Sequence, residues 1–184
     1  NKIITSGGGG MIITNNKKLA EKCKYLSTQA TNDSIIYKHD DIGYNYRLTN
    51  IQAALGVGQL EQLENILERK REINLRYSEN LNAINGLKIS STPSYASNNN
   101  WLNILQIDLK EYHETPIELM NRLEDKGIQT RPVWYLNHKQ KPFINYQSFK
   151  IELAEKLLKT SLCLPSSFSL SNSQIDYISN SISN

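Results

Sequence analysis

The stretch GYNYRLTNIQAALGVGQLEQL, residues 43–63, joins an aromatic, polar segment to the start of a long helical pattern. From Thr49 or Asn50 onward, apolar and small residues recur at the three- and four-residue spacing of a helix. They are Ile51, Ala54, Leu55, Gly58, Leu63, Ile66 and Leu67. The pattern runs on to the turn residues Asn85-Gly86. We therefore predict one long helix over residues 49–85, closely packed at its small-residue start and continuing as a connector.

The residues before this helix predict a short strand, a helix and a polar segment. Residues 9–16, GGMIITNN, have the apolar run and the closing turn residues of a short buried strand. Residues 16–30 predict a helix with Leu19, Cys23 and Leu26 on one face. The polar segment after it is rich in aromatic residues, which is unusual for a plain connector.

After Gly86 the pattern changes to alternating strands and helices. Strands are predicted at 87–90, 101–109, 128–134 and 161–165, and helices at 115–127, 149–160 and 171–182. Thr115 and Pro116 are typical of a helix start and Gly127 of a helix end. Ser171 and Gln174 have the spacing of a capping box. Residues 86–184 therefore predict a small α+β domain.

Composition excludes several classes of protein. Of the 184 residues, 39% are hydrophobic and 21% are charged, which is ordinary for a soluble globular chain. The net charge of +3 is too small to indicate nucleic acid binding, and no aromatic platform accompanies a basic cluster. The densest basic run, ERKREINLR at 68–76, has interleaved glutamates. It predicts a solvated or intersubunit helix face.

Cys23 and Cys163 lack the spacing of a disulfide framework or a metal site, which favours free thiols in a reducing cytoplasm. The three histidines are far apart in the sequence, so we expect no metal. No segment has the pattern of a membrane span or a signal peptide. The chain does not begin with methionine, and we expect it to be part of a longer protein.

The first residues, NKIITSGGGGMIIT, place Lys2 five residues ahead of four consecutive glycines. The run is neither a Walker A loop nor a dinucleotide fingerprint, because no Lys-Ser/Thr follows it and no strand precedes it in the chain. Residue patterns alone therefore indicate a soluble α/β domain, without an activity.

Four segments together resemble one enzyme family. Residues 1–14 resemble the Schiff-base segment of the DegT/StrS nucleotide-sugar aminotransferases, although Gly8 stands where the family usually has glutamate. Residues 43–63 resemble the family's second signature, 131–143 its third and 163–178 its usual ending. The order is right and the segments span the whole chain.

The resemblance implies the fold of a type I pyridoxal 5'-phosphate (PLP) enzyme. The chain is then α/β: residues 1–48 end the large PLP-binding domain, 49–85 form the long connecting helix, and 86–184 form the small α+β C-terminal domain. Elements that hold the pyridine nitrogen and stack on the ring would precede this chain. We therefore expect the chain alone to be an incomplete, inactive C-terminal half.

The resemblance also implies roles for single residues. Lys2 would be the catalytic lysine that binds the cofactor, and Asn45 would reach the cofactor phosphate of the other subunit in a homodimer. Arg47 would lie near the substrate's anionic groups, with a surface position as the alternative, and Tyr46 would also bind substrate. His138 and Trp134 would lie near the substrate, although a structural hydrogen bond and packing explain them equally well. For Gln52 a helix-surface position is the plain alternative.

The implied reaction is transfer of an amino group from L-glutamate to the C4 ketone of a UDP-linked 4-keto-6-deoxy-N-acetylhexosamine. This chemistry belongs to cytoplasmic steps of bacterial surface-glycan synthesis, nonulosonic acids among them. A GDP- or dTDP-linked keto sugar is the alternative within the class. Family dehydratases replace the lysine by histidine, so Lys2 argues against that activity. A non-catalytic dimerisation module is a third hypothesis.

Overall fold

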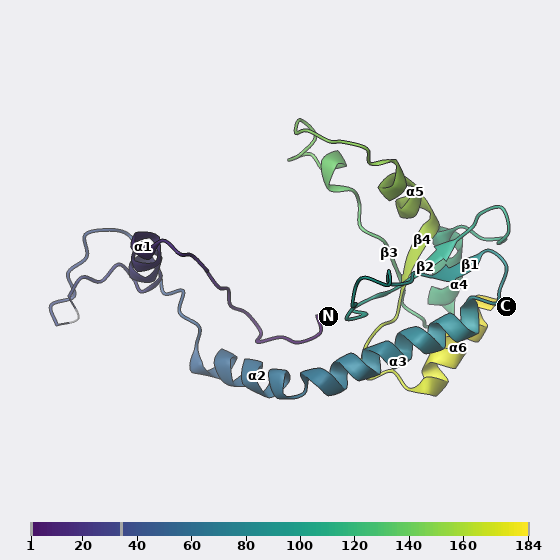
Figure 1. Cartoon of the computed structure of the whole chain (residues 1–184), viewed down its shortest axis with the longest axis horizontal. Helices are drawn as coiled ribbons and strands as arrows, with labels where there is room; N and C mark the ends of the chain where they lie inside the picture. Colours follow the sequence, from purple (N-terminus) through teal and green to yellow (C-terminus); the bar gives the residue numbers. More distant parts are fainter. Residues whose placement is uncertain (1, 34, 184) are drawn as a thin grey trace. The chain divides into compact units, whose positions relative to one another are not determined.

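The computed structural model describes residues 2–33 and 35–183, and these form two compact units. The N-terminal unit comprises Lys2–Leu63, and the C-terminal unit begins at Glu64. Figure 1 draws the elements of each unit along the chain. In the residues described, no helix is both long enough and apolar enough to cross a membrane.

The N-terminal unit contains two helices, α1 (Lys17–Ser27) and α2 (Asn50–Glu61). The α1 helix begins where the Asn16 side chain accepts a hydrogen bond from the Leu19 backbone N–H, at 3.2 Å. The α2 helix begins with a capping box between Thr49 and Gln52. Both caps satisfy backbone N–H groups that a helix start leaves without partners. The helical prediction for residues 16–30 is confirmed over α1.

The predicted buried strand at residues 9–16 is wrong. Residues 9–14 have no regular structure, and Met11, Ile12 and Ile13 are 84%, 69% and 88% exposed. A buried strand needs a neighbouring strand and a covering layer. The described part of this unit offers only isolated bridges, Thr28 with Asn45 and Thr31 with His39.

The single long helix predicted for 49–85 is also wrong. The chain forms α2 and then α3 (Leu63–Leu81), with Gln62 between them. The Gln62 N–H donates to the carbonyls of Gln59 and Leu60, which lie three and two residues back. In an α-helix this N–H would donate to the carbonyl four residues back, so the α-helical pattern is interrupted at Gln62. No residue of α2 is buried, contrary to the close packing expected of its small residues. The division into 1–48, 49–85 and 86–184 stays a prediction.

The C-terminal unit is built on a four-stranded antiparallel sheet. Its strands are β1 (Leu87–Ile89), β2 (Asn103–Ile107), β3 (Arg131–Pro132) and β4 (Ser161–Leu164), in the spatial order β1-β2-β4-β3. Leu105 lies opposite Ile89 on one side and Leu162 on the other, so these side chains share a face. Gln106, opposite Lys88 and Ser161, lies on the other face, because strand side chains alternate.

The apolar face of the sheet packs against helices to form the core. These helices are α3, α4 (Pro116–Asp125) and α6 (Asn172–Ser183); α3 and α6 lie side by side in Figure 1. Ile73 and Tyr77 of α3, Leu119 of α4 and Ile175 of α6 are fully buried. The polar face carries the shorter helix α5 (Glu152–Thr160), in which no residue is buried. The α+β prediction for this part of the chain is confirmed.

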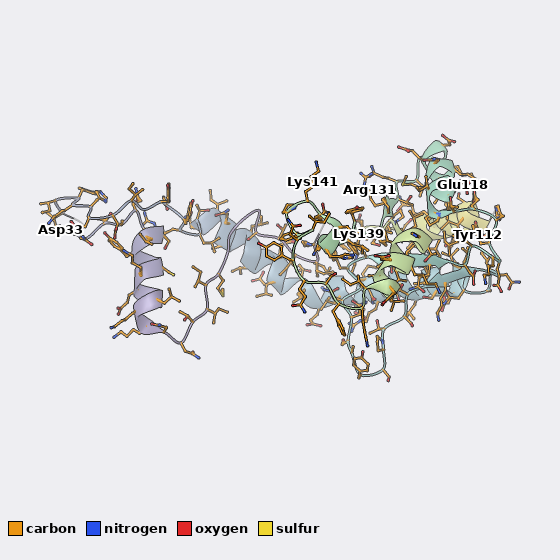
Figure 2. All side chains as sticks on the ribbon, turned by 90° about the horizontal axis from the view of Figure 1, so that it is seen from above. Asp33, Tyr112, Glu118, Arg131, Lys139 and Lys141 are labelled. Atoms are coloured by element: carbon orange, nitrogen blue, oxygen red, sulfur yellow. The ribbon has the colours of Figure 1, made fainter. Side chains whose placement is uncertain are left out.

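Local helix signals in this unit act as the sequence predicts. Thr115 caps α4 in a box with Glu118 (labelled in Figure 2), and Pro116 occupies the first turn. Ser171 accepts from the Gln174 N–H at 3.2 Å, and the Gln174 side chain accepts from the Ser171 N–H at 2.9 Å. Cys23 and Cys163 are both free thiols, as expected.

Candidate functional site

The candidate site begins at Lys2 and the glycine run, both in the N-terminal unit. Lys2 is exposed, and the backbone after it turns through hydrogen bonds from the Gly7 N–H to Thr5 Oγ1 and from Ser6 Oγ to the Gly8 carbonyl. A Cβ built on Gly8 would lie 2.8 Å from Nε2 of Gln52. The glycine run therefore passes close to the start of α2, where a side chain at position 8 would have to displace the Gln52 amide.

Gln52 is thus more than a helix-surface residue. Its Oε1 accepts from the Thr49 backbone N–H at 3.2 Å and lies 3.1 Å from Thr49 Oγ1. The same side chain closes the capping box of α2 and borders the glycine run. The sequence carries the signal for the first contact, a threonine three residues before a glutamine. The second contact depends on the fold alone.

The segment 43–47 is fixed by pairing with the end of α1. The backbone N–H groups of Tyr44 and Tyr46 donate to the carbonyls of Leu26 and Ser27, each at 2.9 Å. Gly43 lies so close to this neighbour that a Cβ there would be 2.5 Å from the Ala30 backbone nitrogen. A side chain at this position cannot fit without moving backbone, so glycine is required.

Pairing of this segment brings Asn45 and Arg47 together. Asn45 Oδ1 accepts from the backbone N–H and from Nε of Arg47, both at 3.4 Å, and the Arg47 guanidinium also donates to Gln29 Oε1 at 3.4 Å. Tyr46 is 75% exposed and stacks on Tyr44, with ring centroids 5.4 Å apart. An amide and a guanidinium therefore lie side by side just before α2, and two stacked tyrosine rings belong to the same segment.

His138 and Trp134 belong to the C-terminal unit. His138 lies in the 3-10 helix η1 (Asn137–Lys139), with Nε2 3.6 Å from Glu155 Oε1 on α5. Lys139, labelled in Figure 2, is 2.9 Å from the same carboxylate oxygen. The hydrogen bond from Lys139, with a smaller contribution from His138, lowers the pKa of Glu155. These two contacts tie the segment after β3 to α5.

Trp134 stacks on Trp101, with ring centroids 6.1 Å apart, while 57% of its surface and 57% of Tyr135 remain exposed. Its indole packs on one side and is open on the other, which agrees both with a packing role and with a position near the substrate. Trp134 and His138 thus share one segment of the C-terminal unit. Asn45, Arg47 and Tyr46 share another in the N-terminal unit, which also holds Lys2.

One residue of the basic run at 68–76, Lys70, departs from the solvated face predicted as one alternative for the run, and the intersubunit alternative stays a prediction. Lys70 is only 4% exposed and donates to the backbone carbonyls of Trp101, at 2.8 Å, and Ser166. Burial lowers the pKa of Lys70 to about 8. Arg76 pairs with Asp176 of α6 through two bonds of 2.5 and 2.7 Å. Nothing local in the sequence distinguishes buried Lys70 or the paired Arg76 from solvated cations.

The chemistry of the N-terminal unit fits part of a PLP site. Lys2 offers an amine, and Asn45 and Arg47 offer N–H groups beside a helix start, where backbone N–H groups and the helix dipole favour anions. A phosphate-bearing aldehyde needs such groups. The fit is partial, since the resemblance assigns the pyridine-nitrogen partner to residues outside this chain.

Comparison with known proteins decides the family. Residues 1–183 match the DegT/DnrJ/EryC1/StrS aminotransferase family. The chain belongs to that family. Its fold is similar to that of the aminotransferase TlmJ from Streptoalloteichus hindustanus, with a TM-score of 0.81 at 23% identity over 98% of this chain and 48% of that one. The resemblance and the fold class read from the sequence are confirmed.

Two curated relatives are nucleotide-sugar enzymes by name. GDP-perosamine synthase of Escherichia coli O157:H7 is 41% identical over 99% of this chain and 48% of that protein. UDP-4-amino-4,6-dideoxy-N-acetyl-beta-L-altrosamine transaminase of Campylobacter jejuni is 38% identical over 42% of this chain and 21% of that protein. The chain spans about half the length of the first of these relatives.

Proposed function

We propose that this chain is the C-terminal half of a PLP-dependent aminotransferase that acts on a nucleotide-linked keto sugar, with L-glutamate as amino donor. The observation that carries the proposal is the family match over residues 1–183, which includes Lys2 and the segment 43–63. The half of its relatives that the chain does not span would supply the remaining cofactor contacts. Bacterial surface-glycan synthesis is the proposed setting, and the cytoplasm the proposed location.

Three residues of this chain would each have a separate role in the reaction. When bound, PLP supplies an electron sink for the amino transfer. Lys2 would bind the cofactor and, once its amine is released, carry a proton at Nζ between substrate and cofactor carbons. Asn45 would donate to the cofactor phosphate. Arg47 would hold the substrate carboxylate or phosphate oxygens in pairs, which its planar guanidinium favours.

The test uses the full-length protein that contains this chain. Purified protein is expected to show the visible absorption of bound PLP and to form 2-oxoglutarate from glutamate when a keto sugar nucleotide is added. Lys2→Ala should remove the visible absorption and lower turnover by at least about a thousandfold, the scale expected when a covalent catalyst is lost. Lys17→Ala, at an exposed lysine of α1, is the control. Unchanged absorption in Lys2→Ala would contradict the proposal.

Two nucleotides, UDP and GDP, are candidates for the one linked to the keto-sugar substrate. The sequence resemblance favours the C4 ketone of a UDP-linked 4-keto-6-deoxy-N-acetylhexosamine. A GDP-linked 4-keto sugar is supported by the relative that matches 99% of the chain, against 42% for the UDP-sugar relative. Running the same assay with both substrates side by side separates these candidates by their kcat/KM.

We further propose a homodimer whose two active sites each draw residues from both subunits. Exposed apolar side chains of the N-terminal unit support this, because a second subunit could cover them. Ile35, Ile42 and Tyr46 are 84%, 84% and 75% exposed. If Lys2 and Asn45 act in one site from different subunits, mixed dimers of Lys2→Ala and Asn45→Asp should regain activity. One site of each mixed dimer is then intact. Mixtures that stay as inactive as the two parents would contradict the arrangement.

A further inference from the structure

Residues 6–9, which include the first three glycines of the run, lie along one face of α2 within the N-terminal unit. A Cβ built on Gly8 would lie 2.8 Å from Nε2 of Gln52. About one turn further along the helix, a Cβ built on Gly56 would lie 3.5 Å from Cβ of Ser6. This segment therefore runs along α2 in the direction opposite to the helix.

The residues of α2 that are partly covered lie on the same face. They are Gln52, Ala53, Gly56 and Gln59, and the other residues of α2 are exposed. These four recur at the three- and four-residue spacing of one helix face. Ser6 is partly covered as well. The glycine segment therefore covers part of a helix that has no buried residue.

The contact with Gln52 explains the glycine at position 8. Gly7 and Gly9 have positive φ angles of 78° and 121°, which residues with a side chain rarely adopt. Gly8 has no positive φ angle, so its backbone conformation does not require glycine. The Gln52 amide instead takes the space of a Cβ there, whereas a Cβ on Gly10 would meet no atom within 4 Å.

The Gln52 side chain is itself held in place by the capping box. Its Oε1 accepts from the Thr49 backbone N–H at 3.2 Å, which leaves Nε2 beside Gly8. One side chain thus connects the start of α2 with the segment that carries Lys2. We propose that Gln52 is a positioning residue, which holds the Lys2 segment against α2. Its effect on catalysis rests on the function proposed above, whereas its effect on the segment does not.

Amide hydrogen exchange in the full-length protein that contains this chain tests the effect on the segment. Gly8→Ala puts a methyl group where the Gln52 amide lies, so exchange over residues 3–10 should become faster by about fivefold or more, the low end of the cost of overpacking. In Gln52→Ala that space is empty, and adding Gly8→Ala there should change exchange by less than about twofold. Equal effects of Gly8→Ala in the two backgrounds would overturn the proposal.

Two control variants separate this contact from its surroundings. Gly10→Ala, with no atom within 4 Å of the added Cβ, should leave exchange over the segment unchanged. Thr49→Ala removes the hydroxyl of the capping box but keeps the backbone N–H that holds Gln52 Oε1. It should speed exchange in the first turn of α2 alone, whereas Gln52→Ala should also speed exchange over residues 3–10. The same pattern in Thr49→Ala and Gln52→Ala would overturn the proposal.

The kinetic consequence is measured on the full-length protein with glutamate as donor. Displacement of Lys2 in Gly8→Ala and in Gln52→Ala should lower kcat by about ten- to a hundredfold, because small misplacements of a reacting group are costly. The KM for glutamate should stay within about twofold, since a positioning residue does not touch the substrate. Gly58→Ala, also without an atom within 4 Å of its Cβ, should change neither constant.

The outcomes distinguish the positioning role from the proposed function. A kcat equal to that of the parent in both Gly8→Ala and Gln52→Ala would overturn the positioning role. A raised KM with unchanged kcat would also overturn it, because Gln52 would then act in substrate binding. An inactive parent protein would count against the proposed function alone, since the exchange measurement still decides whether Gln52 holds the Lys2 segment.

Discussion

The two units of this chain differ in how they bury apolar side chains. In the C-terminal unit, residues of α3, α4, α6 and the sheet form one core, with Ile73, Leu105, Leu119 and Ile175 fully buried. In the described part of the N-terminal unit, Ala30 is the one buried apolar residue. Since apolar burial is the main favourable term in folding, the C-terminal unit has its own source of stability and the N-terminal unit has little.

The residues proposed to carry the chemistry do not belong to the unit that has the apolar core. Lys2, Asn45 and Arg47 lie in the unit without a core, held by backbone pairing and caps. The chain spans about half the length of the relative GDP-perosamine synthase, and our proposal makes the N-terminal unit part of a larger domain. Three predictions test whether the contrast between the units is real in solution.

The largest effect is expected from removing the same side chain in each unit. Ile73 of α3 is fully buried, whereas Ile13 is 88% exposed. Ile73→Ala should lower the free energy of unfolding by about 2–5 kcal/mol, through lost burial and the cavity left behind. Urea unfolding followed by tryptophan fluorescence reports on this unit, because both tryptophans, Trp101 and Trp134, belong to it.

Ile13→Ala is the matched variant in the N-terminal unit. It should change the free energy of unfolding by less than about 0.5 kcal/mol, as is usual for exposed positions. Far-UV circular dichroism of the same samples follows α1 and α2 as well. A cost for Ile13→Ala equal to that of Ile73→Ala would show that Ile13 is buried in solution and would erase the contrast.

An intermediate effect is expected from Lys70, the cation buried in the C-terminal unit. Its pKa is lowered from 10.5 to about 8 by burial. Between these values the unfolded chain holds a proton at Lys70 that the folded chain has lost, so this residue makes stability rise with pH. Below about pH 8 both states are protonated and the contribution is constant.

Lys70→Met isolates this contribution from those of other groups. Burial raises the pKa of the Cys163 thiol and of Tyr77, and both make stability fall at high pH. The difference between the parent chain and Lys70→Met cancels them. This difference should move in favour of the parent by about 2–3 kcal/mol between pH 7 and pH 10, measured by urea unfolding. A difference independent of pH would show that the Lys70 amine is solvated.

Sequence reasoning succeeded where the signal is local or where several segments combine. Cap residues predicted the starts of α4 and α6, and four signatures in order predicted the family. It failed at residues 9–16 and at Gln62. An apolar run becomes a strand only beside another strand, and the helical pattern is the same on both sides of Gln62.

For the candidate site, the sequence proposes residues but not their geometry, and the roles it assigns to them stay predictions. The resemblance pointed to Asn45 and Arg47, and the structure brings their side chains within 3.4 Å. The contact of the glycine run with Gln52 and the burial of Lys70 depend on segments far apart in the sequence. No local pattern of residues carries that information.

The smallest effect is expected from one capping box in each unit. Thr115 caps α4 with Glu118, and Thr49 caps α2 with Gln52, through the same pair of hydrogen bonds. Replacement of an N-cap threonine by alanine costs about 1 kcal/mol when the helix is part of the cooperative structure. Thr115→Ala should therefore lower the free energy of unfolding of the C-terminal unit by about that amount, because α4 contributes Leu119 and Leu123 to the core.

Thr49→Ala removes the same hydrogen bonds from a helix with no buried residue. Tryptophan-detected unfolding should be unchanged, and the loss should appear only as faster amide hydrogen exchange in the first turn of α2, by about fivefold for a cap of that strength. The two variants share their chemistry, so a difference between them reports the surroundings of each helix. If Thr49→Ala lowers the unfolding free energy as much as Thr115→Ala does, α2 belongs to the same cooperative structure as the core.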